Sequence, residues 1–119
     1  MIQEDKELIH KDLCARLPYD VMCQTDEHGK IHKLKGINKH KGIWWYEFDG
    51  FRNIKLPKPY LRPMSSMTEK EKIDYQAFFN YDGVEYPEEY IDWCNKNHFD
   101  YRGLIPIGLA LVAPEGMYN

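Results

Sequence analysis

The sequence contains no long run of apolar residues. No stretch approaches the roughly 18 consecutive apolar residues that a membrane-spanning helix needs. Residues 1–6 are polar and acidic, whereas a secretory signal begins with a basic segment followed by an apolar one. We therefore expect a cytoplasmic protein that does not enter a membrane.

Cysteine is scarce too. The three cysteines, Cys14, Cys23 and Cys94, are widely separated and include no CxxC pair. An odd and dispersed set of cysteines does not suit a disulfide framework and indicates reduced thiols. Because each cysteine lies near apolar residues, we interpret all three as small buried hydrophobic side chains.

The rest of the composition is sufficient for one folded domain. The 119 residues are 43% hydrophobic and 14% aromatic, which is too apolar for a disordered chain. A domain of this length buries roughly two-thirds of the surface that its unfolded chain exposes. We expect residues 1–119 to form a single domain around one core.

A first helix is predicted over residues 3–17. Proline disfavours helical backbone in the residue before it, so Pro18 ends this helix. Apolar residues follow its length at helical spacing and predict its buried stripe. They are Ile2, Ile9, Leu13 and Leu17.

Two further helices are predicted in the second half of the chain. Thr68 and Glu71 fit a capping box at the start of a helix over 69–79. Pro87 suits the first position of a helix that ends near residue 97. The side chains of the helix over 69–79 that we expect to face inward are Ile73, Ala77 and Phe78.

A first β-hairpin is predicted in the segment that follows the N-terminal helix. Polar and apolar residues alternate over 19–25, and a second strand follows over 31–35. A two-residue loop at 28–29 would place Cys23 opposite Leu34.

The second hairpin has the clearer turn, Asp49-Gly50. A type I′ turn needs positive φ at both central residues, and Asp-Gly is a favoured pair there. The flanking strands span 43–48 and 51–56. Counting back from the turn predicts the cross-strand pairs Phe48–Phe51, Glu47–Arg52, Trp45–Ile54 and Ile43–Leu56.

This register divides the second hairpin into two apolar faces. The face that we expect to join the core carries Ile43, Trp45, Ile54 and Leu56. The opposite face is either covered by a helix or forms a surface for a partner. It carries Trp44, Tyr46, Phe48 and Phe51.

The remaining segments complete an α+β fold. Residues 36–42 are predicted to form a loop, and Pro57, Pro59 and Pro63 are expected to break the strand over 51–56. The short apolar run 109–112 predicts a central or covered strand. The expected architecture is a small, mostly antiparallel sheet of two hairpins and a C-terminal strand, packed with about three helices.

Four segments together resemble a group of uncharacterised short proteins of gut anaerobic bacteria and their phage-like or mobile elements. The segments read KDLCARLPY (11–19), KPYLRPMSSMT (58–68), HFDYRGLI (98–105) and APEGMYN (113–119). The resemblance implies a phage-like or mobile-element setting. It implies no activity, and it assigns no functional residue.

Basic residues gather in the middle of the chain. Residues 28–62 hold seven Lys and two Arg against two carboxylates, although the whole chain has a net charge of −3. Lysines beside aromatic rings are typical of single-stranded nucleic-acid sites, where cations hold phosphates and rings stack on bases. The lysines of this candidate site, which lie beside Trp44 and Tyr46, are Lys30, Lys33, Lys35, Lys39, Lys41 and Lys55.

Residues with metal-binding or catalytic chemistry are present without a recognisable motif. Cys23, His28 and His32 lack the tight local pairs of a structural zinc site. Cys94 and His98 are one helical turn apart, as a thiol–imidazole pair requires. We instead expect His98 to be favoured at a helix C-terminus, Asp100 to cap a further turn and Arg102 to pair with a surface carboxylate.

The sequence therefore predicts a non-enzymatic accessory or binding protein, with no cofactor and no metal. We expect a protein partner, or a second copy of the chain, to bind the aromatic face of the second hairpin. Its expected contact residues are Trp44, Tyr46, Phe48 and Phe51. The alternative is nucleic-acid binding through residues 30–55.

Overall fold

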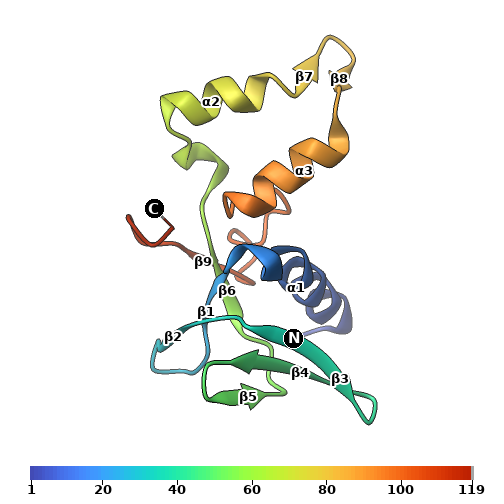
Figure 1. Cartoon of the computed structure of the whole chain (residues 1–119), viewed down its shortest axis with the longest axis vertical. Coiled ribbons are helices and arrows are strands. Elements are labelled where there is room, and N and C mark those ends of the chain that lie inside the picture. Colours follow the sequence, from blue (N-terminus) through green and yellow to red (C-terminus); the bar gives the residue numbers. More distant parts are fainter. Residues whose placement is uncertain (119) are drawn as a thin grey trace.

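Helix α1 (Gln3–Arg16) lies across the middle of the molecule, between the β-strands and helix α3 (Figure 1). The computed structural model describes residues 1–118. Ile9 and Leu13 are fully buried, as predicted, whereas Ile2 is exposed at the start of the helix. A 3₁₀ turn (Leu17–Tyr19) containing Pro18 follows the helix, so the expected end of the helix is confirmed.

A four-stranded sheet packs against α1, with the strand order β2-β1-β6-β9. The sheet is antiparallel except for the pairing of β6 with β9. Its strands are β1 (Met22–Gln24), β2 (Ile31–Lys33), β6 (Lys58–Leu61) and β9 (Leu111–Val112).

The first hairpin forms, but its predicted register is wrong. Cys23 lies opposite His32 rather than Leu34. The loop is longer than two residues because the Asp26 carboxylate accepts hydrogen bonds from the backbone N–H groups of His28 and Lys30. These two bonds, at 2.9 and 3.0 Å, stabilise a wider turn that the sequence pattern did not indicate.

The strand over 51–56 ends before Pro57, as expected, but a further strand over Lys58–Leu61 was not predicted. Pro59 is fully buried within β6, a central strand. Strand β6 tolerates Pro59, which has no backbone N–H group to donate, because each neighbouring strand pairs with only two of its residues. Its first half pairs with β1 and its second half pairs with β9.

Strand β9 lies at the edge of the sheet, so the prediction of a central or covered strand is wrong. The chain beyond it returns to the sheet through the Tyr118 side chain. The Tyr118 hydroxyl accepts the Met22 N–H at 2.9 Å and donates to the Tyr60 carbonyl at 2.6 Å. Tyr118 thereby joins β1 to β6 from outside the ladder.

The second sheet is a three-stranded meander of β3 (Gly36–His40), β4 (Ile43–Phe48) and β5 (Phe51–Asn53). The expected loop over 36–42 is therefore wrong for its first five residues. They form β3, which pairs with β4 through a two-residue turn at Lys41 and Gly42. Both turn residues have positive φ, 49° and 79°, as a type I′ turn requires.

The predicted register of the 43–56 hairpin is correct near its turn only. Phe48 pairs with Phe51 and Glu47 with Arg52, but the ladder ends one pair later, before the expected Trp45–Ile54 and Ile43–Leu56 pairs. The predicted type I′ turn is wrong too. Gly50 has φ of 84°, whereas Asp49 is not among the residues with positive φ.

The predicted core face of this hairpin is wrong for Ile43 and Ile54, whereas the helix-covered alternative for the other face is correct for Tyr46 and Phe48. Tyr46 and Phe48 are core residues, only 3% and 6% exposed. Ile43 and Ile54, which we expected in the core, are 48% and 55% exposed. The reason is the position of α1, which packs on the face that carries Tyr46.

Residues 63–92 form an arm that projects from one end of the molecule (Figure 1). The capping box at Thr68 and Glu71 is confirmed, and so is proline at the start of α3. A small hairpin at the tip of the arm was not predicted. The arm contains α2 (Glu69–Gln76), β7 (Phe79–Asn80), β8 (Gly83–Val84) and most of α3 (Pro87–Lys96).

The arm is held by aromatic contacts instead of a buried core. None of residues 63–92 is buried, and Ile73, expected to face inward, is exposed. Rings from α2, the tip and α3 lie 4.7 to 6.4 Å apart between centroids. They belong to Tyr75, Phe78, Phe79, Tyr90 and Trp93.

The predicted α+β class is confirmed: three α-helices pack with small, mostly antiparallel sheets. Among residues 1–118, no helix has the length and apolar character needed to cross a membrane.

Candidate functional site

A groove of about 610 Å³ runs between α1 and β4. The polar half of its lining comes from α1 and the apolar half from β4 and the segment after β5. The lining residues are Gln3, Lys6, Glu7 and His10 on α1 and Ile43, Trp44, Tyr46, Ile54 and Leu56 on the other side. We call this feature the α1–β4 groove.

The floor of the groove is a hydrogen-bonded pair of uncharged groups. His10 Nδ1 lies 2.7 Å from the Tyr46 hydroxyl. Burial lowers the pKa of His10 and raises the pKa of Tyr46 to about 12, so both side chains are neutral near pH 7. The pair holds the two walls together without placing a charge in the groove.

The rim of the groove exposes large apolar side chains. Ile43, Trp44 and Ile54 are 48%, 41% and 55% exposed. Trp44 is positioned by the His10 ring, 4.5 Å away between centroids, and by Lys39, whose Nζ lies 5.5 Å from the indole centroid. Apolar side chains gathered around a groove are characteristic of a surface that another molecule covers.

The structure does not bring the four predicted partner-binding residues to one surface. Trp44 lies on the groove, and Tyr46 contributes to its floor. Phe48 belongs to the core. Phe51 is exposed at the other end of the hairpin, where its ring stacks on Phe48 with centroids 5.1 Å apart. The idea of an exposed Trp44–Tyr46–Phe48 face is therefore wrong, and Trp44 is the member that remains available.

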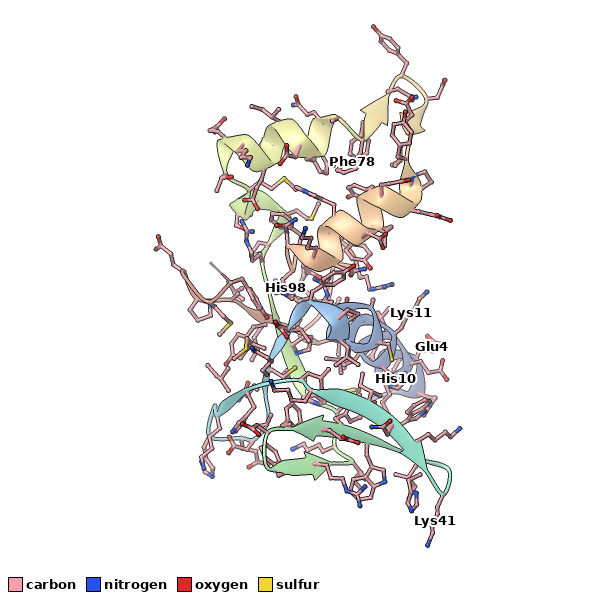
Figure 2. All side chains as sticks on the ribbon, in the orientation of Figure 1. Glu4, His10, Lys11, Lys41, Phe78 and His98 are labelled. Carbon is pink, nitrogen blue, oxygen red and sulfur yellow. The ribbon has the colours of Figure 1, made fainter. Side chains whose placement is uncertain are left out.

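The lysines predicted to bind nucleic acid lie on β2 and β3 and in the segments next to β2, β3 and β5. Lys39 and Lys41 are on the β3–β4 hairpin, and Lys41 marks its tip (Figure 2). Lys33 lies 4.0 Å from Asp20, and Lys55 lies beside the groove-lining Ile54 and Leu56. Apart from Lys33, which is half-buried, the set is exposed: Lys30, Lys35, Lys39, Lys41 and Lys55.

His98 is a neutral, buried residue and not the charged helix terminus that we expected. Its Nε2 lies 2.8 Å from the Tyr19 carbonyl, and its ring stacks on Tyr118 with centroids 3.8 Å apart. Burial is the main cause that lowers the pKa of His98 to about 4. Cys94 is fully buried, and burial raises the pKa of its thiol. His98 lines a depression beside Tyr118, and Cys94 is not part of its lining.

The prediction made for Asp100 is confirmed, whereas the prediction made for Arg102 is wrong. Asp100 caps a turn as predicted, since its two carboxylate oxygens accept the N–H groups of Leu104 and Ile105 at 2.8 and 2.9 Å. Arg102 does not pair with a surface carboxylate. Its Nε donates at 3.1 Å to Asp12, which is fully buried.

Asp12 lies at the centre of a buried ion cluster that sequence reasoning missed. Its second carboxylate oxygen accepts a 3.0 Å bond from Arg16 Nε, and Arg16 also donates to the Phe99 carbonyl at 2.6 Å. Asp12 and Arg16 are both fully buried. The four-residue spacing of the pair was visible in the sequence, but such pairs usually lie on the solvent face of a helix.

Within residues 1–118, no three His, Cys, Asp or Glu side chains are arranged to hold a metal ion. Cys23, the first of the three residues considered for a zinc site with His28 and His32, is fully buried in the core.

Comparisons with protein-family models, curated proteins and solved structures find no match to the chain. The α1–β4 groove is the feature of the molecule from which a function is best derived.

Proposed function

We propose that the protein is a non-enzymatic binding module that holds an apolar segment of a protein partner in the α1–β4 groove. The observation that supports this most strongly is the partial exposure of Ile43, Trp44 and Ile54 around one depression. Covering these side chains removes apolar surface from water, at about 25 cal/mol per Å² before the costs of association.

Trp44 is the expected anchor of the interaction. Large aromatic residues at the centre of an interface contribute most of the binding free energy, because they bury a wide area with few rotatable bonds. The ring is already positioned by His10 and Lys39, so binding orders little that is not ordered in the free protein.

Charge around the groove favours a partner segment that combines apolar and acidic residues. Lys39 lies over the ring of the groove residue Trp44, and Lys55 lies between the groove residues Ile54 and Leu56 in the sequence. On α1 the lining carries one lysine and one carboxylate, Lys6 and Glu7. Charges at the rim of an interface guide association and select partners more than they add affinity.

The test is selection of displayed peptides on the purified protein, followed by affinity measurements on variants. We expect the selected peptides to carry an aromatic or branched aliphatic residue beside carboxylates. Trp44→Ala should weaken their binding at least about tenfold, the scale of a loss above 1 kcal/mol at an interface hot spot.

Trp45→Ala is the matched control, because Trp45 lies on the opposite face of β4 beneath the Arg52 guanidinium, 4.3 Å from its ring centroid. Equal loss in the two variants, or the absence of any enriched peptide, would contradict the proposal.

Nucleic-acid binding is the second candidate, supported by the exposed lysines of residues 30–55 and by the Arg52–Trp45 stack. Phosphate contacts weaken steeply as salt rises, whereas an anchored aromatic contact changes little. Quenching of tryptophan fluorescence by short single strands at low salt, lost at physiological salt and lost in Trp45→Ala, would favour this reading.

A further inference from the structure

The two ends of the molecule carry opposite charge. The molecule measures 47 Å along its longest axis, with the arm at one end and the three-stranded meander at the other (Figure 1). Residues 28–46, which include β2 and the first part of the meander, hold five Lys and no Asp or Glu. The meander itself, residues 36–53, holds two Lys and one Arg against Glu47 and Asp49. Residues 73–95 hold no Lys or Arg but six carboxylates: Asp74, Asp82, Glu85, Glu88, Glu89 and Asp92.

Most of the charges at both ends are free of ion pairs with other described residues. Glu69 and Glu71, nearer the base of the arm, pair with Lys72 and Arg62. The six carboxylates within residues 73–95 are exposed, and within residues 1–118 none of them lies within 4.0 Å of a basic side chain. At the meander end the same holds for Lys39 and Lys41. Each end therefore presents a charge that the fold does not neutralise.

The tip of the arm also carries apolar side chains that the described residues leave wholly or partly exposed. Tyr81, at the turn between β7 and β8, is fully exposed, and Val84 and Tyr86 are 40% and 51% exposed. They alternate with Asp82 and Glu85. The tip is thus an aromatic and acidic segment, which is the chemistry that the α1–β4 groove fits.

We propose that the tip of the arm (residues 79–86) of one copy binds in the α1–β4 groove of a second copy. This inference rests on the proposed function of the groove and names its occupant. Tyr81 supplies the ring that covers Ile43, Trp44 and Ile54. The carboxylates beside Tyr81 face the lysines of the β3–β4 hairpin, Lys39 and Lys41.

The contact joins different surfaces of the two copies. In the structure the tip lies at one end of the molecule, whereas α1 and β4, which line the groove, lie in its middle and at its other end, so the tip is away from its own groove (Figure 1). Each bound pair retains one free tip and one free groove. Repetition of such a head-to-tail contact gives open chains, or a ring where the rotation closes.

The test is sedimentation velocity of the full chain over a range of concentrations at low and at high salt. We expect a series of sizes that grows with concentration and shrinks as salt screens the exposed charges. A particle that remains a monomer at every concentration at low salt would overturn the inference.

Two variants identify the contact, because each removes one of its halves. Trp44→Ala damages the groove and keeps the tip, whereas Tyr81→Ser damages the tip and keeps the groove. Either variant by itself should no longer form the larger particles. An equimolar mixture should form a particle of two copies that does not grow further, because only one compatible pair of surfaces remains.

Further variants exclude a loss of folding as the cause. Ile54→Ser changes a second exposed groove residue, and Ile107→Ser changes an equally exposed residue that does not line the groove. The first should reduce assembly and the second should not. Assembly that survives both Trp44→Ala and Tyr81→Ser would show a different interface and overturn the inference.

The outcomes also separate this inference from the proposed function. If the protein is monomeric but still binds selected peptides, and Trp44→Ala abolishes that binding, the groove has the proposed function. In that case a second copy of the chain is not its occupant. A protein that assembles without any dependence on Trp44, and whose peptide binding is also unchanged in Trp44→Ala, rejects both.

Discussion

At the scale of single residues, Asp12 is a carboxylate that is fully buried and held by ion pairs. Arg16 and Arg102 both donate to its carboxylate, at 3.0 and 3.1 Å, and both Asp12 and Arg16 are fully buried. A buried ion pair contributes little net stability relative to an apolar replacement, but removal of one partner leaves an uncompensated buried charge. The cluster also joins α1 to the chain beyond α3.

Asp12→Ala should therefore lower the free energy of unfolding by about 3–5 kcal/mol. Urea denaturation followed by far-UV circular dichroism measures this change. Lys11→Ala, at the exposed neighbouring position of α1 (Figure 2), is the control and should remain within about 0.5 kcal/mol of the wild type. A loss below about 1 kcal/mol for Asp12→Ala would contradict a buried cluster.

His98 predicts a pH dependence of stability at the same scale. Burial and the nearby Arg16 charge lower its pKa to about 4 in the folded protein, whereas an unfolded histidine titrates near 6.5. As the pH falls below about 6.5, the unfolded chain therefore takes up a proton that the folded chain does not. The stability contributed by His98 is complete above that pH and decreases continuously toward pH 4.

Urea midpoints between pH 7 and pH 5 should fall less steeply in His98→Asn than in the wild type. Asn tolerates the left-handed backbone of this position, where φ is 60°. Some slope should remain, because burial lowers the pKa of His10 as well. His28→Asn, at an exposed loop position, should keep the full slope. Equal slopes in the two variants would show that residue 98 is not a buried neutral histidine.

At the scale of elements, one ion pair fastens the arm to the rest of the molecule. The Arg62 guanidinium donates to both oxygens of Glu71, at 2.8 and 2.6 Å. Glu71 also accepts the Thr68 N–H in the capping box, at 2.9 Å. These contacts, chiefly the one with Arg62, lower the pKa of Glu71 to about 2.

Glu71→Gln should loosen the arm while leaving the sheets intact. Gln preserves the capping-box geometry but removes the charge that Arg62 pairs with. We expect amide hydrogen exchange to accelerate in α2 and to remain unchanged in β1 and β6. Glu69→Gln is the control, because its pair with Lys72 is solvent-exposed. Equal acceleration in both variants would indicate that Arg62 does not hold the arm.

Three helix boundaries were predictable from the sequence because their causes are local, whereas the predicted end of the second helix at 79 is wrong, since α2 ends at Gln76. Pro18, the Thr68–Glu71 capping box and Pro87 each act within a turn of their own position. The inner face of the meander was not predictable, because it depends on which side α1 covers. Strand β3 was missed although Lys41-Gly42 forms its turn, since Lys carries little preference for positive φ.

Within the candidate site, sequence reasoning found Trp44 and the lysines but not the groove. His10 and Tyr46 are 36 positions apart, and no local pattern indicates that their side chains meet. The exposed tip of the arm was missed for a related reason. A segment this rich in aromatic residues is typical of a hydrophobic core, and only the fold shows that these residues are not buried in one.

At the scale of the whole molecule, the chain is more extended than its length suggests. Its radius of gyration is 15.1 Å, whereas a globular domain of this size has about 13.5 Å. The difference comes from the arm, which contains no buried residue between 63 and 92. A segment without a buried core is expected to open locally at low cost.

Limited digestion with chymotrypsin should therefore cut first at Tyr81, before any site in the sheets. The ring is fully exposed at a turn, whereas Tyr46 is buried. Mass spectrometry of the early fragments identifies the cut, and Tyr81→Ser should slow it. Early cleavage at Tyr46 would instead indicate that the meander opens before the arm.

The position of β9 and Tyr118 has a consequence for how the chain folds as it is synthesised. Residues 111–118 leave the ribosome after every strand that they contact, and until then one edge of β6 has no partner. The four-stranded sheet is therefore completed last, by a short parallel strand and a single phenol. A message truncated before Leu111 would release a chain with an open β6 edge, ready to pair with another nascent chain.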